Sequence, residues 1–428
     1  MKTVLVTGVT GIIGRPFVAE LLRRGYAVIA LCRSIAPSKK FPNGVSVKER
    51  LCHRGFKNDI RSGKLVCVDG DFTREFCGME EDKFVEIRKR APMACFHLGG
   101  NTNFSELPTN REVWTANVVG MENILKLCNS VGISMLHVGS SFVVCGDGNL
   151  QEKFYENDLW VEQTHRNIYE RSTYHKERLA GYFYGRGGVW IHRLPITVGL
   201  TEEEANGDGV PPGFIDDFSG YYGYFYMFSK TYEKIRRIFT EETSSNLDKR
   251  TDLECAGVYY DSGTDRVYLP IVVPARRTPL IMASVGWVVR TMADLFDLSI
   301  DSPPYASRGV FHVVNPPENA PHVVDVITHS LDALRIDGVK IMSDERVYAP
   351  LPPSLTGLAG VYESEIGKAL EMFRPYTIEY MPRIVSDETM RVLAQGGRAC
   401  AMPPPHDAKR FHELMDFAQI HKFRPLYP

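Results

Sequence analysis

The first 200 residues predict an α/β fold in which helices cover both faces of a doubly wound parallel sheet. Short apolar runs alternate with helical patterns along this stretch, as in chains that join parallel strands through crossover helices. A glycine-rich turn lies directly between the first apolar run and the first helical pattern. Since 428 residues exceed one ordinary domain, we also expect a smaller substrate-binding or cap lobe and a C-terminal extension.

Within this region, the expected strands are short apolar runs bounded by glycine or polar residues. They cover residues 3–7, 27–31, 65–68, 93–98, 134–138 and 190–194. The expected helices show apolar residues at three- and four-residue spacing. They cover residues 12–24 and 112–128.

Composition divides the chain into four regions. Residues 1–200 form the expected core, with residues 36–61 as a basic insertion on its surface. Residues 201–275 are expected to form a cap or lid, because acidic, aromatic (FSGYYGYFYMFSK) and polar stretches interrupt the alternation. Residues 276–330 are expected to return to the core and the substrate lobe, and residues 331–428 to extend that lobe.

Further elements are expected beyond the core. Helical patterns cover residues 230–239, 285–296 and 408–421, and the run VFHVV at 310–314 predicts a strand that rejoins the sheet. The aromatic cluster of the cap has two interpretations. Its rings line an apolar pocket, or they pack the core of the cap itself.

Composition and charge exclude several classes of partner. A hydrophobic fraction of 44% and a charged fraction of 24% are typical of a soluble globular protein. A net charge of −2 does not favour nucleic acid or an anionic membrane. We expect no membrane span, because the chain has no run of about 18 apolar residues. We also expect no secretory signal, because the start MKTVLVTG runs directly into a strand. The nine scattered cysteines lack metal-binding spacing, so no metal site and a cytoplasmic location are expected.

The strongest motif is TGVTGIIG, which follows the first strand and opens the first helix. Gly8 permits a tight turn, Gly11 lets the backbone approach a pyrophosphate, and Gly14 lets helix and strand pack closely. The motif predicts a Rossmann-type dinucleotide site, and the alternative is a glycine-rich turn without a ligand. The residues expected to contact the cofactor are Thr7, Gly8, Thr10, Gly11, Ile12, Ile13 and Gly14.

The end of the second strand favours NADP over NAD. Folds that choose NAD place an acid there to hold the ribose 2′-hydroxyl, whereas this chain has Arg33 followed by Ser34. A guanidinium suits a 2′-phosphate, and the Ser34 hydroxyl adds a contact. The alternative is that Arg33 is a solvated residue at a strand end.

The third and fourth strands end in VDGDF and HLGGNTNF. Asp71, followed by Phe72, is placed to accept a hydrogen bond from the adenine amine. Leu98 and the small residues Gly99 and Gly100 let the backbone pass under the cofactor. Ordinary turn chemistry at strand ends is the alternative for both motifs.

Together these motifs resemble one family. TGVTGIIG, VDGDF, HLGGNTNF, NVVGMENIL, the Gly-Ser-Ser run at 139–141, NIYERS and RLPITVG follow the order found in extended short-chain dehydrogenases/reductases. Within that family, YERS and the later MFRPYTIEYMPRI resemble the thioester-reductase and fatty acyl reductase, or male-sterility-like, branch. The resemblance implies that NADPH reduces a carbonyl, or an acyl thioester to an aldehyde. The implied substrate is a small molecule or an acyl group on a carrier protein or coenzyme A.

The resemblance also implies catalytic residues. Ser141 supplies the hydroxyl, Tyr169 is the acid, and Asn117 is the supporting amide. Ser140 competes with Ser141 for the first role, and Tyr174 is a weaker rival of Tyr169. The same family pattern places Asn117, Tyr169, Pro195 and Thr197 among the cofactor contacts.

One position departs from the family. The residue four after Tyr169 is Thr173, where the family has a lysine that lowers the tyrosine pKa and holds the nicotinamide ribose. Thr173 can hydrogen-bond the ribose but supplies no charge. Lys176 lies seven positions after Tyr169, about 20° away around a helix, so it could replace the missing lysine. A lysine on a solvated face is the alternative.

Three functions are compatible with this pattern. The first is an atypical NADPH-dependent reductase. The second is a non-catalytic NADP-binding protein, which the loss of the lysine supports. The third is an epimerase or dehydratase on the same fold, which usually has an acid after the second strand and the lysine.

Overall fold

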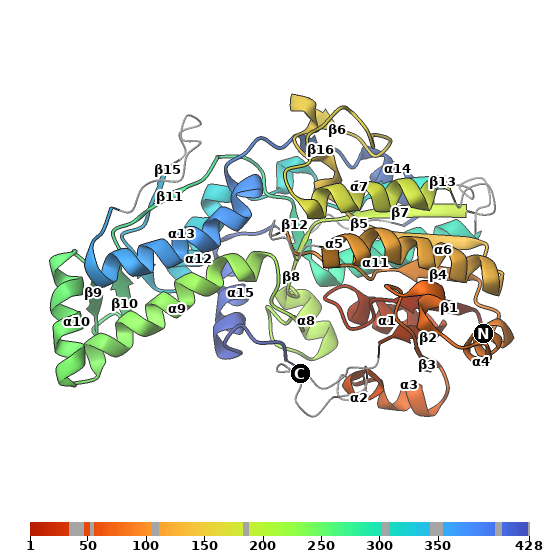
Figure 1. Cartoon of the computed structure of the whole chain (residues 1–428), viewed down its shortest axis with the longest axis horizontal. Helices are drawn as coiled ribbons and strands as arrows, with labels where there is room; N and C mark the ends of the chain where they lie inside the picture. Colours follow the sequence, from red (N-terminus) through yellow and green to blue (C-terminus); the bar gives the residue numbers. More distant parts are fainter. Residues whose placement is uncertain are drawn as a thin grey trace.

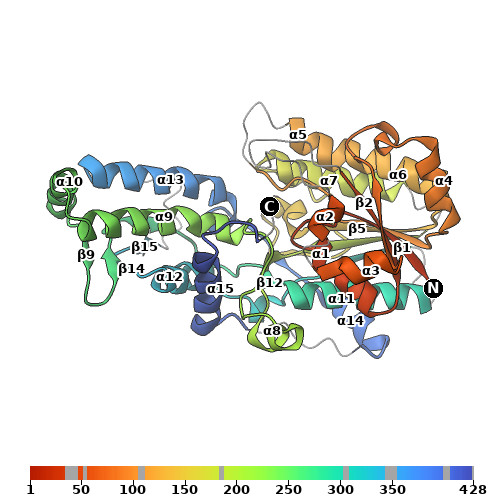
Figure 2. The same ribbon diagram turned by 90° about the horizontal axis from the view of Figure 1, so that it is seen from below.

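A computed structural model describes residues 1–33, 47–51, 55–104, 111–182, 188–301, 308–342, 354–398 and 405–426. The chain forms two lobes, which Figures 1 and 2 show side by side. The sheet lobe contains both the N-terminus and the large parallel sheet. The helical lobe is built mainly from long helices and small sheets.

The sheet lobe is built on seven parallel strands in the order β13-β7-β5-β4-β1-β2-β3. The strands are β1 (Thr3–Thr7), β2 (Ala27–Cys32), β3 (Leu65–Asp69), β4 (Ala94–His97), β5 (Met135–Ser141), β7 (Gly188–Leu194) and β13 (Arg308–His312). The order reverses between β1 and β4, which is where open parallel sheets bind ligands. The doubly wound α/β fold and the strands expected from the sequence are confirmed.

Helices cover both faces of this sheet (Figure 2). One face packs against α1 (Gly14–Arg23) and α11 (Val285–Asp301), and the other against α4 (Glu81–Lys89), α6 (Gly120–Val131) and α7 (Ile168–Gly181). The alternation of side chains along a strand explains the division. Val4 and Val6 belong to the first core and Leu5 to the second, and all three are fully buried.

Shorter elements complete the sheet lobe and its border. They are α2 (Val47–Leu51), α3 (Lys57–Arg61), α5 (Arg111–Trp114), α8 (Glu202–Asp208), α14 (Asp387–Gln395), and the paired strands β6 (Lys153–Phe154) with β16 (Arg383–Ile384) and β8 (Ile196–Val198) with β12 (Met282–Ser284). Most of the predicted insertion at 36–61 lies outside the described residues. In its described part, Leu51 and Phe56 are buried in the core of the sheet lobe, and the other residues whose burial is described are exposed or half-buried.

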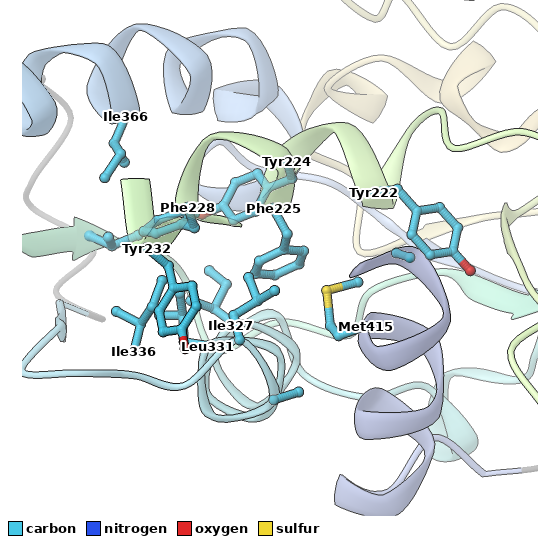
Figure 3. Packing of buried hydrophobic residues seen from close by; sticks show 14 of the residues in the cluster. Tyr222, Tyr224, Phe225, Phe228, Tyr232, Ile327, Leu331, Ile336, Ile366 and Met415 are labelled. Atoms are coloured by element: carbon cyan, nitrogen blue, oxygen red, sulfur yellow. The ribbon is translucent and has the colours of Figure 1, made fainter. Parts of the chain in front are cut away.

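The helical lobe combines α9 (Tyr221–Thr240), α10 (Ser244–Cys255), α12 (Val323–Ala333), α13 (Gly357–Thr377) and α15 (Ala408–Ile420). Its small sheets pair β9 (Tyr259–Asp261), β10 (Arg266–Tyr268) and β14 (Ile336–Asp337), and β11 (Val272–Pro274) with β15 (Lys340–Met342). Figure 3 shows its core, where Phe225, Phe228 and Tyr232 of α9 face α12. The helix expected at 230–239 is therefore too short, because it begins at Tyr221 and includes the aromatic cluster.

A buried ion pair joins α7 to the sheet. Arg193 on β7 and Glu177 on α7 are each 1% exposed, and their closest nitrogen and oxygen atoms are 2.9 Å apart. The guanidinium also donates to the carbonyl oxygen of Asp158 at 2.6 Å, and Ser140 donates to the Glu177 carboxylate at 2.5 Å. These bonds satisfy two charges that would otherwise be buried without partners.

Replacing Glu177 by Gln leaves the Arg193 charge buried without its counter-ion. We expect Glu177→Gln to lower the free energy of unfolding by about 3–5 kcal/mol, measured by urea denaturation. The matched control is Glu254→Gln, which breaks an exposed pair with Arg250 and is expected to change stability by about 0.5 kcal/mol or less. Equal stability of the two variants would contradict the role of the buried pair.

Candidate active site

A cavity of about 650 Å³ lies between the lobes, at the carboxyl ends of the central strands. Its sheet-lobe wall comes from residues 11–14, 98–104, 139–143 and 194–197, together with Asn117, Tyr169, Thr173 and Lys176. Its helical-lobe wall is largely apolar and comes from α9, α12 and the end of α13. The cavity therefore lies where the reversal of strand order predicts a ligand site.

The glycine loop is shaped for the close approach of a phosphate. Gly8 has a φ of 73°, and a Cβ atom there would lie 2.6 Å from the Gly99 nitrogen. A Cβ atom on Gly14 would lie 2.0 Å from the Gly8 carbonyl oxygen. Helix α1 begins at this loop with no side-chain cap and no acidic residue in its first turn. Free amide groups at a helix start bind anions, so the loop fits a pyrophosphate.

The predicted adenosine-side residues Arg33, Asp71 and Phe72 are not among the residues that line the cavity. Arg33 follows β2 with an exposed side chain, and Ser34 lies outside the described residues. One Asp71 carboxylate oxygen accepts from the backbone nitrogen of Thr73 at 3.0 Å and from its hydroxyl at 2.7 Å. The Phe72 ring lies directly under Gly99, where a Cβ atom would be 2.6 Å from it. Phe72 therefore packs beneath the strand end, which explains the glycine above it.

Asn117 connects the loop after β4 to α7. It lies in a π-helical turn (Thr115–Val119) between α5 and α6, a feature frequent at functional sites. Its amide oxygen accepts from the Asn101 backbone nitrogen at 2.8 Å. Its amide nitrogen donates to the Asn101 carbonyl oxygen at 2.9 Å and to the Ser172 hydroxyl at 2.8 Å. A Cβ atom on Gly100 would lie 2.9 Å from the Asn117 amide oxygen, so a glycine suits that position.

The structure brings Ser141 and Tyr169 together in the cavity wall. Burial raises the pKa of Tyr169, and hydrogen bonds with Ser141 and Thr173 partly oppose this rise. The rival residues are engaged elsewhere. Ser140 donates to Glu177, and the Tyr174 ring lies 5.6 Å from Trp160 and 5.2 Å from His165.

Lys176 lies at the floor of the cavity. Its side chain is buried, and its ammonium donates to the carbonyl oxygen of Gly139 at 2.8 Å and to that of Gly99 at 3.2 Å. Burial lowers its pKa to about 8, although the Glu177 carboxylate acts in the opposite direction. The alternative of a lysine on a solvated face is therefore wrong. Thr173 donates its hydroxyl back to the Tyr169 carbonyl oxygen at 2.8 Å.

The predicted aromatic cluster serves both of its proposed roles. Tyr221, Tyr224 and Phe225 line the cavity, whereas Tyr222 is buried in the lobe core and accepts from the Gly199 backbone nitrogen at 3.0 Å. Leu98, Pro195 and Thr197, also expected from the sequence, lie in the cavity wall. The wall also contains residues that sequence reasoning missed as site residues, namely Phe104, Phe373 and Tyr376. Their only signals were two motifs: Phe104 ends HLGGNTNF, and Phe373 and Tyr376 lie in MFRPYTIEYMPRI.

The described parts of the chain contain neither a cluster of metal-ligating residues nor a membrane-spanning helix. No group of three or more His, Cys, Asp or Glu residues there is arranged to hold a metal ion. No helix among those residues is long and apolar enough to span a bilayer.

Comparisons with known proteins agree with this geometry. Glycine betaine reductase ATRR from Emericella nidulans is 28% identical over 164 residues, which cover 38% of this chain and 12% of that protein. Fatty acyl-CoA reductase 1 from Mus musculus is 26% identical over 256 residues, which cover 52% of this chain and 47% of that protein. The chain thus spans about an eighth of the first relative and about half of the second.

A solved structure, the terminal R domain from the myxalamid PKS-NRPS biosynthetic pathway, is similar in fold. The two share 19% identity with a TM-score of 0.67, and the match covers 100% of this chain and 93% of the other. At this identity the likeness shows the fold alone. The family model described as male sterility protein, an NAD-binding domain, matches residues 6–248, which is more than half of the chain. The chain therefore belongs to the male sterility protein family, in the reductase branch of the extended short-chain dehydrogenases/reductases.

Proposed function

We propose that the protein is an NADPH-dependent reductase that converts an acyl thioester to an aldehyde. One observation carries the proposal: Ser141, Tyr169 and the Lys176 ammonium line one cavity with the glycine loop. The apolar wall opposite them suits an acyl chain. Relatives named as reductases of fatty acyl-CoA, of glycine betaine and of aldehydes support the same chemistry.

Different residues of the chain would hold the pyrophosphate, the 2′-phosphate and the nicotinamide half of the cofactor. The loop at residues 11–14 would bind the pyrophosphate, and Arg33 the 2′-phosphate that distinguishes NADPH from NADH. Gly99 and Gly100, which follow β4, line the part of the cavity where the nicotinamide half would bind. A bound nicotinamide dinucleotide supplies the hydride.

The proposed chemistry needs a proton at the substrate oxygen. As hydride adds to the carbonyl carbon, Tyr169 donates its hydroxyl proton to the oxygen, and Ser141 donates a hydrogen bond to it. The resulting hemithioacetal loses its thiol by cleavage of the carbon–sulfur bond. The hydroxyl proton leaves with the thiol, so the product is an aldehyde.

Lys176 would supply the charge that Thr173 lacks. The burial-raised pKa of Tyr169 keeps this residue protonated, which suits a donor but opposes formation of the tyrosinate after proton transfer. A positive charge nearby stabilises that tyrosinate. The Lys176 ammonium lies on the same helix face, in the same cavity wall, and is charged below a pH of about 8.

The reductase activity is tested by mixing the purified protein with NADPH and a panel of acyl-CoA thioesters, acyl-pantetheine thioesters and long-chain aldehydes. We expect oxidation of NADPH with at least one thioester and formation of the matching aldehyde. Tyr169→Phe removes the proton donor and should lower kcat by about 10²- to 10⁴-fold. Tight NADPH binding without turnover on any compound would instead indicate a non-catalytic NADP-binding protein.

Lys176→Met tests whether Lys176 supplies the positive charge that stabilises the Tyr169 tyrosinate. The wild-type rate should fall as the pH rises through about 8, because the folded-state ammonium loses its proton there. In Lys176→Met this fall should disappear, and kcat near pH 7 should drop by about 100-fold. The control is Lys126→Met on the neighbouring helix α6, where the lysine is about half exposed. An unchanged rate and pH profile in Lys176→Met would remove this residue from the mechanism.

Arg33→Ala tests the choice of cofactor. Loss of charge-assisted hydrogen bonds to the 2′-phosphate should raise the KM for NADPH by about 10-fold, with little change for NADH. Arg61→Ala is the matched control, since Arg61 is an exposed arginine on the nearby helix α3. An equal response of both cofactors to Arg33→Ala would show that Arg33 does not recognise the 2′-phosphate.

A further inference from the structure

A tyrosine from the C-terminal region enters the candidate active site. Tyr376, near the end of α13, lines the cavity together with Tyr169. The Phe104 ring lies between them, with its centroid 5.6 Å from that of Tyr376 and 6.4 Å from that of Tyr169. Tyr376 is therefore a further phenol in a cavity wall that also contains Tyr169, Tyr221 and Tyr224, and the reaction described above does not use it.

The hydrogen bonds around Tyr376 show that its hydroxyl oxygen acts as an acceptor toward Asn167. The Asn167 side chain caps α7, and its oxygen accepts from the Glu170 backbone nitrogen at 2.9 Å. Only an oxygen can accept that bond, so the other end of the amide is the nitrogen. This nitrogen donates to the Tyr376 hydroxyl oxygen at 3.1 Å. The Tyr376 hydroxyl accepts from Asn167, and its own O–H remains available to donate into the cavity.

A buried ion pair holds the Tyr376 backbone against α7. Arg166, whose closest nitrogen lies 2.7 Å from a Glu170 carboxylate oxygen, also donates to the carbonyl oxygens of Pro375 at 2.6 Å and Tyr380 at 3.1 Å. Its guanidinium carbon lies 5.4 Å from the centroid of the Tyr376 ring. The segment that contains Tyr376 is thus fixed to the start of the helix that contains Tyr169.

The surroundings of Tyr376 favour a donor that keeps its proton. Burial raises its pKa well above the ordinary value, and the nearby Glu170 carboxylate raises it further. Asn167 and Arg166 act in the opposite direction, but burial dominates. A phenol that stays protonated can donate a hydrogen bond without giving up its proton.

We propose that Tyr376 is a second catalytic hydrogen-bond donor, which binds the carbonyl oxygen of the substrate alongside Tyr169. The inference rests on the proposed reductase function. As hydride adds to the carbonyl carbon, negative charge grows on that oxygen, and a donor already oriented by Asn167 stabilises it without reorganisation. Tyr169 transfers its proton, whereas Tyr376 retains its own. The C-terminal region thereby completes the catalytic site as well as its apolar wall.

The test compares Tyr376→Phe with Tyr380→Phe, using NADPH and the thioester that the wild-type protein reduces best. Tyr376→Phe removes only the hydroxyl and keeps the ring against Phe104. We expect kcat to fall by about 10- to 100-fold, with less than a threefold change in KM and in NADPH affinity. Tyr380→Phe makes the same change nearby, where the hydroxyl donates to the Gln151 carbonyl oxygen at 2.6 Å, and should keep the wild-type kcat.

Three outcomes would overturn the inference. If Tyr376→Phe keeps the wild-type kcat while Tyr169→Phe is inactive, the reductase function stands and the second donor is wrong. If Tyr380→Phe loses as much activity as Tyr376→Phe, the segment has only a structural role. If the wild-type protein turns over no substrate, the proposed function fails first, and the role of Tyr376 fails with it.

Discussion

The placement of helix α7 depends on the ion pair between Glu177 and Arg193. Three residues of that helix line the cavity: Tyr169 near its start, Thr173 one turn later, and Lys176 next to the ion pair itself. The pair is almost completely buried and reaches β5 through Ser140 and β7 through Arg193. A shift of α7 along the sheet would separate Tyr169 from Ser141 and Lys176 from its two carbonyl partners. The geometry of the site therefore rests on a charge pair outside the cavity wall.

In the proposed function, Lys176 supplies the ammonium that the family pattern places three residues earlier, at position 173 of α7. Position 173 has a threonine, which carries no positive charge. Its hydroxyl donates to a backbone carbonyl oxygen of the same helix. One turn later, the long Lys176 side chain reaches the carbonyl oxygens of Gly99, just after β4, and of Gly139 in β5. The arrangement supports a change in the position of the charge rather than a loss of the chemistry.

Local sequence patterns predicted the sheet lobe. They did not predict features that depend on contacts between segments far apart in the chain. The first strand has the expected bounds, because an apolar run and a glycine turn are both local features. Helix α9 was predicted too short, since its first turns are mostly aromatic and are buried from several sides. The burial of Lys176 depends on β4 and β5, and the position of Tyr376 depends on Arg166. Neither relation has a sequence period that could reveal it.

The most direct test of the central claim is the distance between the Lys176 nitrogen and the nicotinamide ribose in a crystal structure with bound NADP⁺. If Lys176 replaces the missing lysine, its ammonium should lie about 3 Å from a ribose hydroxyl oxygen, while Tyr169 and Ser141 face the nicotinamide. A ribose held by Thr173 alone, with Lys176 still on the Gly99 and Gly139 carbonyls and beyond hydrogen-bond reach, would contradict the account.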